Sequence, residues 1–192
     1  MSTLRTFARI ALGGLAVTEG ALAYQRWQVR REVYDLAARR AGAVHRPLVV
    51  VGNPGGGAVT RLYRAYGCGD LCVDITGCPL CKVVQAADVT AGPVSGVADD
   101  SAVVFVSCVL EYVGDAAAAV REIVRMAGSA ENIFAVSVQP WTLTAALYPG
   151  ARWTAVQSAD QMTLTPISQQ QKVLTGGALA GLLVAAMWPK HD

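Results

Sequence analysis

This chain of 192 residues contains few histidines and carries little net charge. Its only histidines are His45 and His191, and 16 basic against 14 acidic residues leave a net charge of +2. A balance this small gives no strong electrostatic footprint for nucleic acid, so we expect no nucleic-acid partner. A histidine-based hydrolase triad or a zinc protease is also disfavoured, because both histidines lie outside the segments that carry the other candidate site residues.

The chain also lacks a clear cleavable secretory signal, and its number of cysteines is odd. The five cysteines are Cys68, Cys72, Cys78, Cys81 and Cys108. These two facts predict reduced thiols and a cytosolic-type compartment. The segment CPLC, from Cys78 to Cys81, resembles half of a zinc knuckle. However, Cys72 lies inside a predicted strand, and the spacing between the cysteine pairs is short for a zinc ribbon, so we expect buried or loop thiols and no metal site.

Apolar residues make up 53% of the chain and are concentrated at its two ends. Residues 7–24 are largely apolar, interrupted by Arg9 and Glu19, and residues 173–188 carry no charge. A membrane span needs about 20 apolar residues, so the second segment is borderline. A signal anchor, a surface helix or a core helix would each fit the first segment, and a buried helix would fit the second. We expect membrane association through at least one end, because a terminal uncharged segment has little domain left to bury it.

Arginines follow the first apolar segment closely: Arg26, Arg30, Arg31, Arg39, Arg40 and Arg46. A basic helix next to an apolar one fits an anionic membrane surface, although a solvated helix face would have the same composition. The excess of arginine after this segment, compared with Arg5 and Arg9 before it, predicts that the following domain lies on the cytosolic face. Small residues four positions apart, Ala16 and Gly20 in one end and Gly177 and Gly181 in the other, would let helices approach closely, which makes a helix-mediated oligomer possible.

Between Pro47 and Asp160, apolar strand-like runs alternate with helical patterns. Strands are expected at Leu48–Val51, Leu71–Ile75, Lys82–Ala87, Ala102–Cys108 and Ile133–Val138. Helices are expected at Ala58–Tyr66 and Asp115–Ala127, the second with Asp115 as its N-cap. This alternation predicts an α/β domain with a parallel sheet and helices on both faces. A final hairpin is expected from residues 153–156 and 162–165.

The run LVVVGNPGGG, from Leu48 to Gly57, is the most informative motif. It reads as a buried strand followed by a glycine turn, and Asp74 ends the next strand about 20 residues further on. Nucleotide-type cofactors use this arrangement: the glycines let the backbone approach the ligand, and the carboxylate accepts hydrogen bonds from ribose hydroxyls. The turn lacks the G-x-G-x-x-G spacing, so a nucleotide-binding oxidoreductase is the weaker alternative.

Taken in order, LVVVGNPGGG, CVDIT, VVQAADVT, DDSAVVFVSCVLEYVGD, AVREIVRMAG and NIFAVSV resemble class I S-adenosylmethionine-dependent methyltransferases of the small methyltransferase-domain type, over about residues 47–138. The resemblance implies a Rossmann-like, doubly wound, mostly parallel sheet, here with apolar N- and C-terminal helices. It implies S-adenosylmethionine as cofactor. It also assigns site residues: Gly52, Asn53, Pro54 and Gly56 at the methionine part, Asp74 with Ile75 at the ribose, Asp88 with Val89 near the adenine, and Ser107 in the floor beside the methyl group.

Methyl transfer from a sulfonium requires mainly positioning and desolvation, so the resemblance assigns no catalytic residue. Glu111 and Tyr112 are candidates for a base, but LEYV also reads simply as the start of a helix. We therefore predict a membrane-associated methyltransferase-like protein that acts on a small molecule, a lipid or a protein. The alternative is a non-catalytic structural or scaffolding protein in a virion or membrane complex, which two departures from the family pattern favour: Val50 where the family has an acid, and Pro54 in place of a glycine.

The expected domain organisation has three parts. Residues 1–46 form an apolar helix and a basic juxtamembrane helix with a linker. Residues 47–165 form the methyltransferase-like α/β domain, and residues 166–192 form an apolar helix that could anchor the chain in a membrane.

Overall fold

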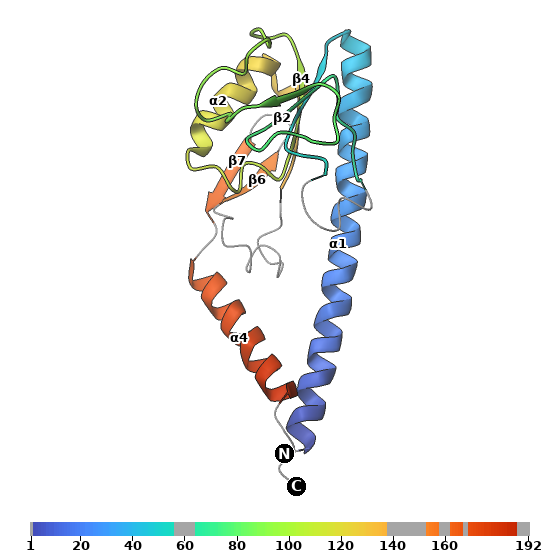
Figure 1. Ribbon diagram of the computed structural model, residues 1–192, viewed down its shortest axis with the longest axis vertical. Helices are drawn as coiled ribbons and strands as arrows, with labels where there is room; N and C mark the ends of the chain where they lie inside the picture. Colours follow the sequence, from blue (N-terminus) through green and yellow to red (C-terminus); the bar gives the residue numbers. More distant parts are fainter. Residues whose placement is uncertain (1, 56–63, 138–152, 158–161, 167–168, 188–192) are drawn as a thin grey trace.

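The computed structural model describes residues 2–55, 64–137, 153–157, 162–166 and 169–187 (Figure 1). The helices are α1 (Ser2–Val44), α2 (Ala116–Ala127), the short 3-10 helix η1 (Ala130–Asn132) and α4 (Gln169–Met187). The strands are β1 (Leu48–Val51), β2 (Leu71–Asp74), β3 (Val84–Ala86), β4 (Val103–Ser107), β5 (Ile133–Val136), β6 (Trp153–Gln157) and β7 (Met162–Pro166). Most of the helix expected at Ala58–Tyr66 lies outside the described residues.

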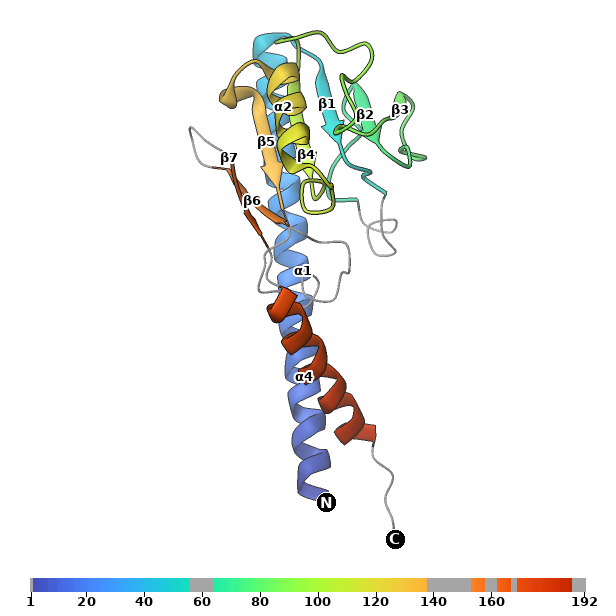
Figure 2. The ribbon, with the colours of Figure 1, turned by 90° about the vertical axis from the view of Figure 1, so that its left-hand side faces the viewer.

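Five strands form one parallel sheet in the order β3-β2-β1-β4-β5 (Figure 2). The chain first moves outward from β1 to β3 and then returns, so that β4 pairs with the other side of β1. Val50 in the central strand lies between Cys72 of β2 and Phe105 of β4. The predicted α/β class, with a mostly parallel sheet and flanking helices, is confirmed.

The central strands are apolar on both sides because each sheet face is covered by a helix. Successive side chains of a strand point to opposite faces. Val49 and Val51 accordingly pack with Ile123 and Met126 of α2, whereas Val50 packs on the other face. There the cover is the last part of α1, through residues that include Ala37 and Ala41, both of which are buried.

Helix α2 begins as the sequence predicted. The side chain of Asp115 accepts a hydrogen bond from the backbone nitrogen of Ala118 at 2.8 Å, which satisfies one of the free amide groups of the first turn. Farther along, Glu122 accepts hydrogen bonds from the backbone nitrogen of Val94 at 2.8 Å and from Arg125 at 2.7 Å. Helix α2 therefore holds the loop between β3 and β4 in place.

Helix α1 is one continuous helix of 43 residues. The sequence predicted an apolar helix, a separate basic helix and a linker ending at residue 46. The structure differs because the segment contains no proline, and isolated glycines such as Gly20 weaken a helix without breaking it. The last turns of α1 pack against the sheet and form part of its hydrophobic core. The domain boundary expected between residues 46 and 47 therefore separates two segments that pack together.

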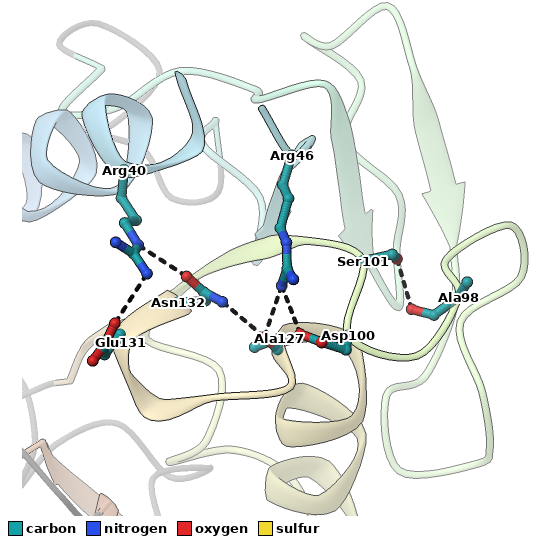
Figure 3. Close-up of polar contacts among 8 residues, drawn as sticks. All are labelled: Arg40, Arg46, Ala98, Asp100, Ser101, Ala127, Glu131 and Asn132. Atoms are coloured by element: carbon teal, nitrogen blue, oxygen red, sulfur yellow. Dashed lines mark hydrogen bonds and ion pairs between the residues drawn. The ribbon is translucent and has the colours of Figure 1, made fainter. Parts of the chain in front are cut away.

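Two arginines of the basic segment, Arg40 in α1 and Arg46 just after it, bond this part of the chain to the rest of the fold (Figure 3). Arg40 donates to the side chain of Asn132 at 3.0 Å and pairs with Glu131 at 3.0 Å. Asn132 is buried and in turn donates to the carbonyl oxygen of Ala127, and Arg46 pairs with Asp100 at 2.6 Å. In the same loop, the hydroxyl of Ser101 donates to the carbonyl oxygen of Ala98, as Figure 3 also shows.

Strands β6 and β7 form the predicted antiparallel hairpin as a separate two-stranded sheet. Strand β6 lies next to β5 (Figure 2). The part of the chain that joins β5 to β6, residues 138–152, is outside the described residues.

The first half of α1 and the whole of α4 extend away from the sheet, and the beginning of α1 and the end of α4 meet at the far end (Figures 1 and 2). Ala8 and Ala186 are buried at this end of the molecule. Large apolar side chains on the same helices are exposed, among them Phe7, Ile10 and Val17 on α1 and Val184 on α4. Within the described ranges, we find no helix that combines the length and the apolar character required to cross a membrane.

Candidate functional site

A cavity of about 260 Å³ lies at the carboxyl ends of four neighbouring strands. Parallel strands bring these ends to one edge of a sheet, and the order of the strands reverses between β1 and β4, which is where ligands bind in open α/β sheets. The lining includes the ends of β1 and β2, at Val51 and Asp74, with Ile75 just after β2. It also includes residues 87–90 after β3 and residues 108, 109 and 112–114 after β4. The sheet thus joins four sequence segments in one hollow.

The glycine turn begins at a position that only glycine tolerates. Gly52 has a φ of +111°, and a Cβ there would lie 2.7 Å from the carbonyl oxygen of Ser107 and 2.9 Å from a methyl carbon of Val109. The backbone nitrogen of Gly52 donates to the carbonyl oxygen of Val73 at 2.8 Å. The missing side chain therefore lets the turn pack directly against the end of β4.

Asp74 joins the glycine turn to β2. One of its carboxylate oxygens, Oδ2, accepts a hydrogen bond from the backbone nitrogen of Asn53 at 3.0 Å. The other, Oδ1, accepts from the backbone nitrogen and the hydroxyl of Thr76 at 2.9 and 2.7 Å. A carboxylate offers about four acceptor positions, so Oδ2 keeps one for a ligand in the cavity.

Asp88 stands after the neighbouring strand β3 with one oxygen committed to the protein. Its Oδ1 accepts hydrogen bonds from the hydroxyl and the backbone nitrogen of Thr90, and these bonds lower the pKa of Asp88. The carboxylate is therefore charged at neutral pH. Apolar side chains lie beside the two acids: Val89 is buried, whereas Ile75 is 69% exposed although it lines the cavity. Two acceptors next to apolar surface suit a polar ring system such as a nucleoside.

The floor of the cavity contains a contact that the sequence did not predict. Cys108 has a φ of +51°, in the left-handed region that residues other than glycine rarely adopt. Its Sγ accepts a hydrogen bond from Nη2 of Arg30 at 2.7 Å, so α1 reaches the site across 78 residues of sequence. Burial raises the pKa of the Cys108 thiol to about 11; Arg30 opposes the rise and Glu111 adds to it. The thiol is consequently neutral at physiological pH.

Further ionisable groups lie behind this floor. Tyr66 is buried, and this burial raises its pKa to about 12, although a hydrogen bond with Ser107 opposes the rise. Glu111 is also buried, whereas Tyr112, the other base candidate from the sequence, lines the cavity. Groups with displaced pKa values that gather at a cavity are typical of functional sites. Arg30 and Tyr66 carry no local motif, so only their position in the fold identifies them.

Of the site residues named from the sequence, Asp74, Ile75, Asp88 and Val89 line the cavity together. Gly52, Asn53 and Pro54 form the adjoining turn, which is bonded to Asp74. Ser107 is buried at the end of β4, against Gly52. Gly56 lies outside the described residues. Val50, where the resembled family has an acid, is fully buried on the face covered by α1.

The prediction of reduced thiols is wrong for four of the five cysteines. The structure contains the disulfides Cys68–Cys81 and Cys72–Cys78, and Cys108 is the free cysteine of the described chain. The physical reason is the turn after β2, which folds the second pair of cysteines back onto the first. The odd number of cysteines is explained by two disulfide-bonded pairs and one free thiol, that of Cys108.

No protein-family model, curated protein or solved structure matches this chain. What the fold and the site define together is an α/β protein with a carboxyl-edge cavity that presents two carboxylates and an apolar wall.

Proposed function

We propose that this chain binds S-adenosylmethionine in the cavity and transfers its methyl group to a small molecule, a lipid or a protein. The observation that carries the proposal is the hydrogen bond of 3.0 Å between Asp74 and the backbone nitrogen of Asn53. It joins the turn after β1 to the acid at the end of β2, next to the point between β1 and β4 where the strand order reverses. The order β3-β2-β1-β4-β5 also supports the doubly wound, Rossmann-like arrangement that the resemblance implies.

The residues present fit the adenosine part of this cofactor. Asp74 would accept a hydrogen bond from a ribose hydroxyl and Asp88 one from the amino group of the adenine, while Ile75 and Val89 would contact the ring. The cavity of about 260 Å³ is slightly smaller than the pockets of about 300 Å³ or more that hold drug-sized ligands. It therefore matches a nucleoside, and the remainder of the cofactor would lie along the glycine turn.

When bound, the cofactor supplies a methyl group that is already activated, so transfer is an in-line displacement. The chain's own task is to orient the reactants and exclude water. Cys108, Val109 and Tyr112 line the side of the cavity formed by the loop after β4. The neutral thiol of Cys108 and the apolar Val109 bring no charge of their own to this side, where the guanidinium of Arg30 is bonded to the thiol. We assign no catalytic base.

Calorimetric titration of the detergent-solubilised protein with S-adenosylmethionine tests the proposal. We expect micromolar binding, and we expect Asp74→Asn to weaken it by about 10- to 100-fold, because a hydrogen bond to a charged acceptor contributes about 1.5–3 kcal/mol. Asp35→Asn is the matched control, since Asp35 is an exposed acid on α1, and it should bind as the wild type does. An absence of both heat and thermal stabilisation in the wild-type protein would end the proposal.

A non-catalytic structural role, in a membrane complex or a virion, is the second candidate. It is favoured by Val50, which is fully buried and leaves no carboxylate at the position where the family binds the amino group of the cofactor. The titration separates the two candidates, because a structural protein of this kind need not bind the cofactor.

We also propose that α1 and α4 attach the protein to a membrane. The support is the set of exposed apolar side chains on both helices at the end where the termini meet. Arg26 and Arg31 lie on the domain side of the apolar segment, which favours a cytosolic position for the domain. We leave Arg30 out of this comparison of arginines on the two sides of the apolar segment, because its side chain is bonded to Cys108 in the site.

Extraction of membranes with alkaline carbonate tests this attachment. We expect the full-length protein to stay in the pellet, and Phe7→Glu to shift it toward the supernatant, because Phe7 is an exposed apolar residue of the distal half of α1. Leu36→Glu is the matched control: Leu36 is an exposed apolar residue of the same helix, beside the domain, and its variant should remain in the pellet. Release of the wild-type protein would contradict the attachment.

A further inference from the structure

Four cysteines form one compact group beside the glycine turn. The sulfur atoms of Cys72, Cys78 and Cys81 all lie within 4.8 Å of one another. The fourth, that of Cys68, is bonded to Cys81. The two disulfides span 13 and 6 residues of sequence, and both end in the turn that follows β2.

The path of the backbone explains why the group is compact. The backbone nitrogen of Cys81 donates to the carbonyl oxygen of Cys78 at 2.9 Å, which closes a four-residue turn between the two cysteines. Cys78 and Cys81 are not bonded to each other; each is paired with a cysteine outside the turn. Four sulfurs are thus presented from the turn, from β2 and from the segment before β2. Cys72 and Cys78 are buried, whereas Cys68 and Cys81 are partly exposed, so the group lies at the edge of the core.

This arrangement is close to that of a tetrahedral thiolate site. With Zn–S bonds of about 2.3 Å, four sulfurs around Zn²⁺ lie about 3.8 Å from one another. The sulfurs of Cys72, Cys78 and Cys81 need shifts on the order of 1 Å to reach that spacing once the S–S bonds are broken. That of Cys68 lies outside the 4.8 Å set and is held next to it by its bond to Cys81, so it must move farther. The short sequence spacing that argued against zinc does not keep the sulfurs apart, because the turn folds one pair onto the other.

We propose that the four cysteines, when reduced, bind one Zn²⁺ as a tetrathiolate, and that the two disulfides are the oxidised, metal-free state of the same site. Reduction requires two equivalents of a dithiol: each passes two electrons and two protons to one S–S bond and becomes a disulfide itself. The four thiols formed in this way lose four protons when they bind the metal. Sulfur ligands in tetrahedral geometry select Zn²⁺ over harder cations such as Mg²⁺.

The group touches the proposed cofactor site but does not depend on that proposal. The Sγ of Cys72 lies 3.8 Å from the carbonyl oxygen of Gly52. Leu80, inside the cysteine turn, packs where a Cβ on Gly55 would be, and the side chain of Asn53 donates to the carbonyl oxygen of Gly77 at 3.3 Å. A change between the disulfide and the zinc state therefore occurs in direct contact with the glycine turn.

Cobalt titration of the full-length protein tests the proposal. The protein is reduced with a dithiol, freed of it without air and titrated with Co²⁺, whose visible absorption identifies tetrahedral thiolate ligands. We expect one equivalent to bind and one equivalent of Zn²⁺ to displace it. Cys78→Ser should abolish the cobalt absorption, and Cys108→Ser should leave the stoichiometry unchanged, because Cys108 is outside the group.

Circular dichroism of the reduced protein makes each outcome decisive. If the reduced chain stays folded and binds no Co²⁺ or Zn²⁺, or if Cys78→Ser keeps the full absorption, the proposal is wrong. If the reduced chain unfolds, refolding by one equivalent of Zn²⁺ supports the site and failure to refold overturns it. Oxidation of the zinc-loaded protein should release one Zn²⁺ per chain to a chromogenic chelator, and retention of the metal after both disulfides form would also overturn it.

Discussion

A Gly52→Ala variant is expected to lose about 4 kcal/mol of its free energy of unfolding. Two effects contribute. The φ of +111° is unfavourable for alanine, and the added Cβ would lie 2.7 Å from a backbone oxygen of Ser107 and 2.9 Å from Val109. Because Val109 lines the cavity, the displacement would also reshape the proposed cofactor site. Urea unfolding followed by circular dichroism measures the first effect, and the titration with S-adenosylmethionine measures the second.

Gly96→Ala separates the two contributions. Gly96 has a φ of +77°, but no atom lies within 4 Å of the position that its Cβ would take. This control should therefore lose only about 1 kcal/mol, the cost of the backbone conformation, and keep its ligand binding. Equal losses in the two variants would show that the close contact between the glycine turn and β4 contributes nothing to stability.

A Phe105→Ala variant is expected to lose a similar amount, about 4 kcal/mol, for a different reason. Phe105 is fully buried in β4, and the rings of Tyr34 and Tyr66 meet it edge-on with centroids 5.4 and 5.0 Å away. Removal of the ring leaves a cavity between the sheet and α1 that these neighbours fill only in part. Urea unfolding again gives the magnitude.

Phe7→Ala is the matched control for this variant. Phe7 is also a phenylalanine and is 65% exposed on the distal half of α1, so its loss should change the free energy of unfolding by less than about 0.5 kcal/mol. If Phe105→Ala were no more harmful than Phe7→Ala, the last turns of α1 would not pack on the sheet in solution, and the fold described above would be wrong at that face.

The sheet was the most predictable part of the molecule. Strands buried on both faces, such as Val103–Ser107, read as continuous apolar runs, and Asp115 marks the start of α2 because it satisfies a free amide of the first turn. Position within a parallel sheet then brings Asp74 and Asp88 to one edge without further information. These features depend on local pattern and on the parallel order of the strands, and both can be read from the chain.

Contacts between distant segments were not predictable. Arg30 looks like one more basic residue after an apolar segment, and nothing near it in sequence indicates that it bonds to Cys108. The disulfides were missed for a related reason, since the pairing depends on how the turn after β2 folds. The continuity of α1 was missed because a change of composition from apolar to basic suggests two helices. The backbone hydrogen bonds of a helix do not depend on whether its side chains are apolar or basic.

The unbroken α1 has a mechanical consequence. With a rise of about 1.5 Å per residue, the stretch from Ser2 to Arg30 is about 42 Å long, and it carries no hinge before it enters the fold. If the N-terminal end of α1 is held in place, the helix therefore fixes the distance from that end to the cavity and the direction in which the cavity opens. A single residue inserted in that stretch would turn the opening by about 100° around the helix axis. Any acceptor of the proposed methyl transfer would thus be restricted by the length of this helical spacer as well as by the chemistry of the cavity.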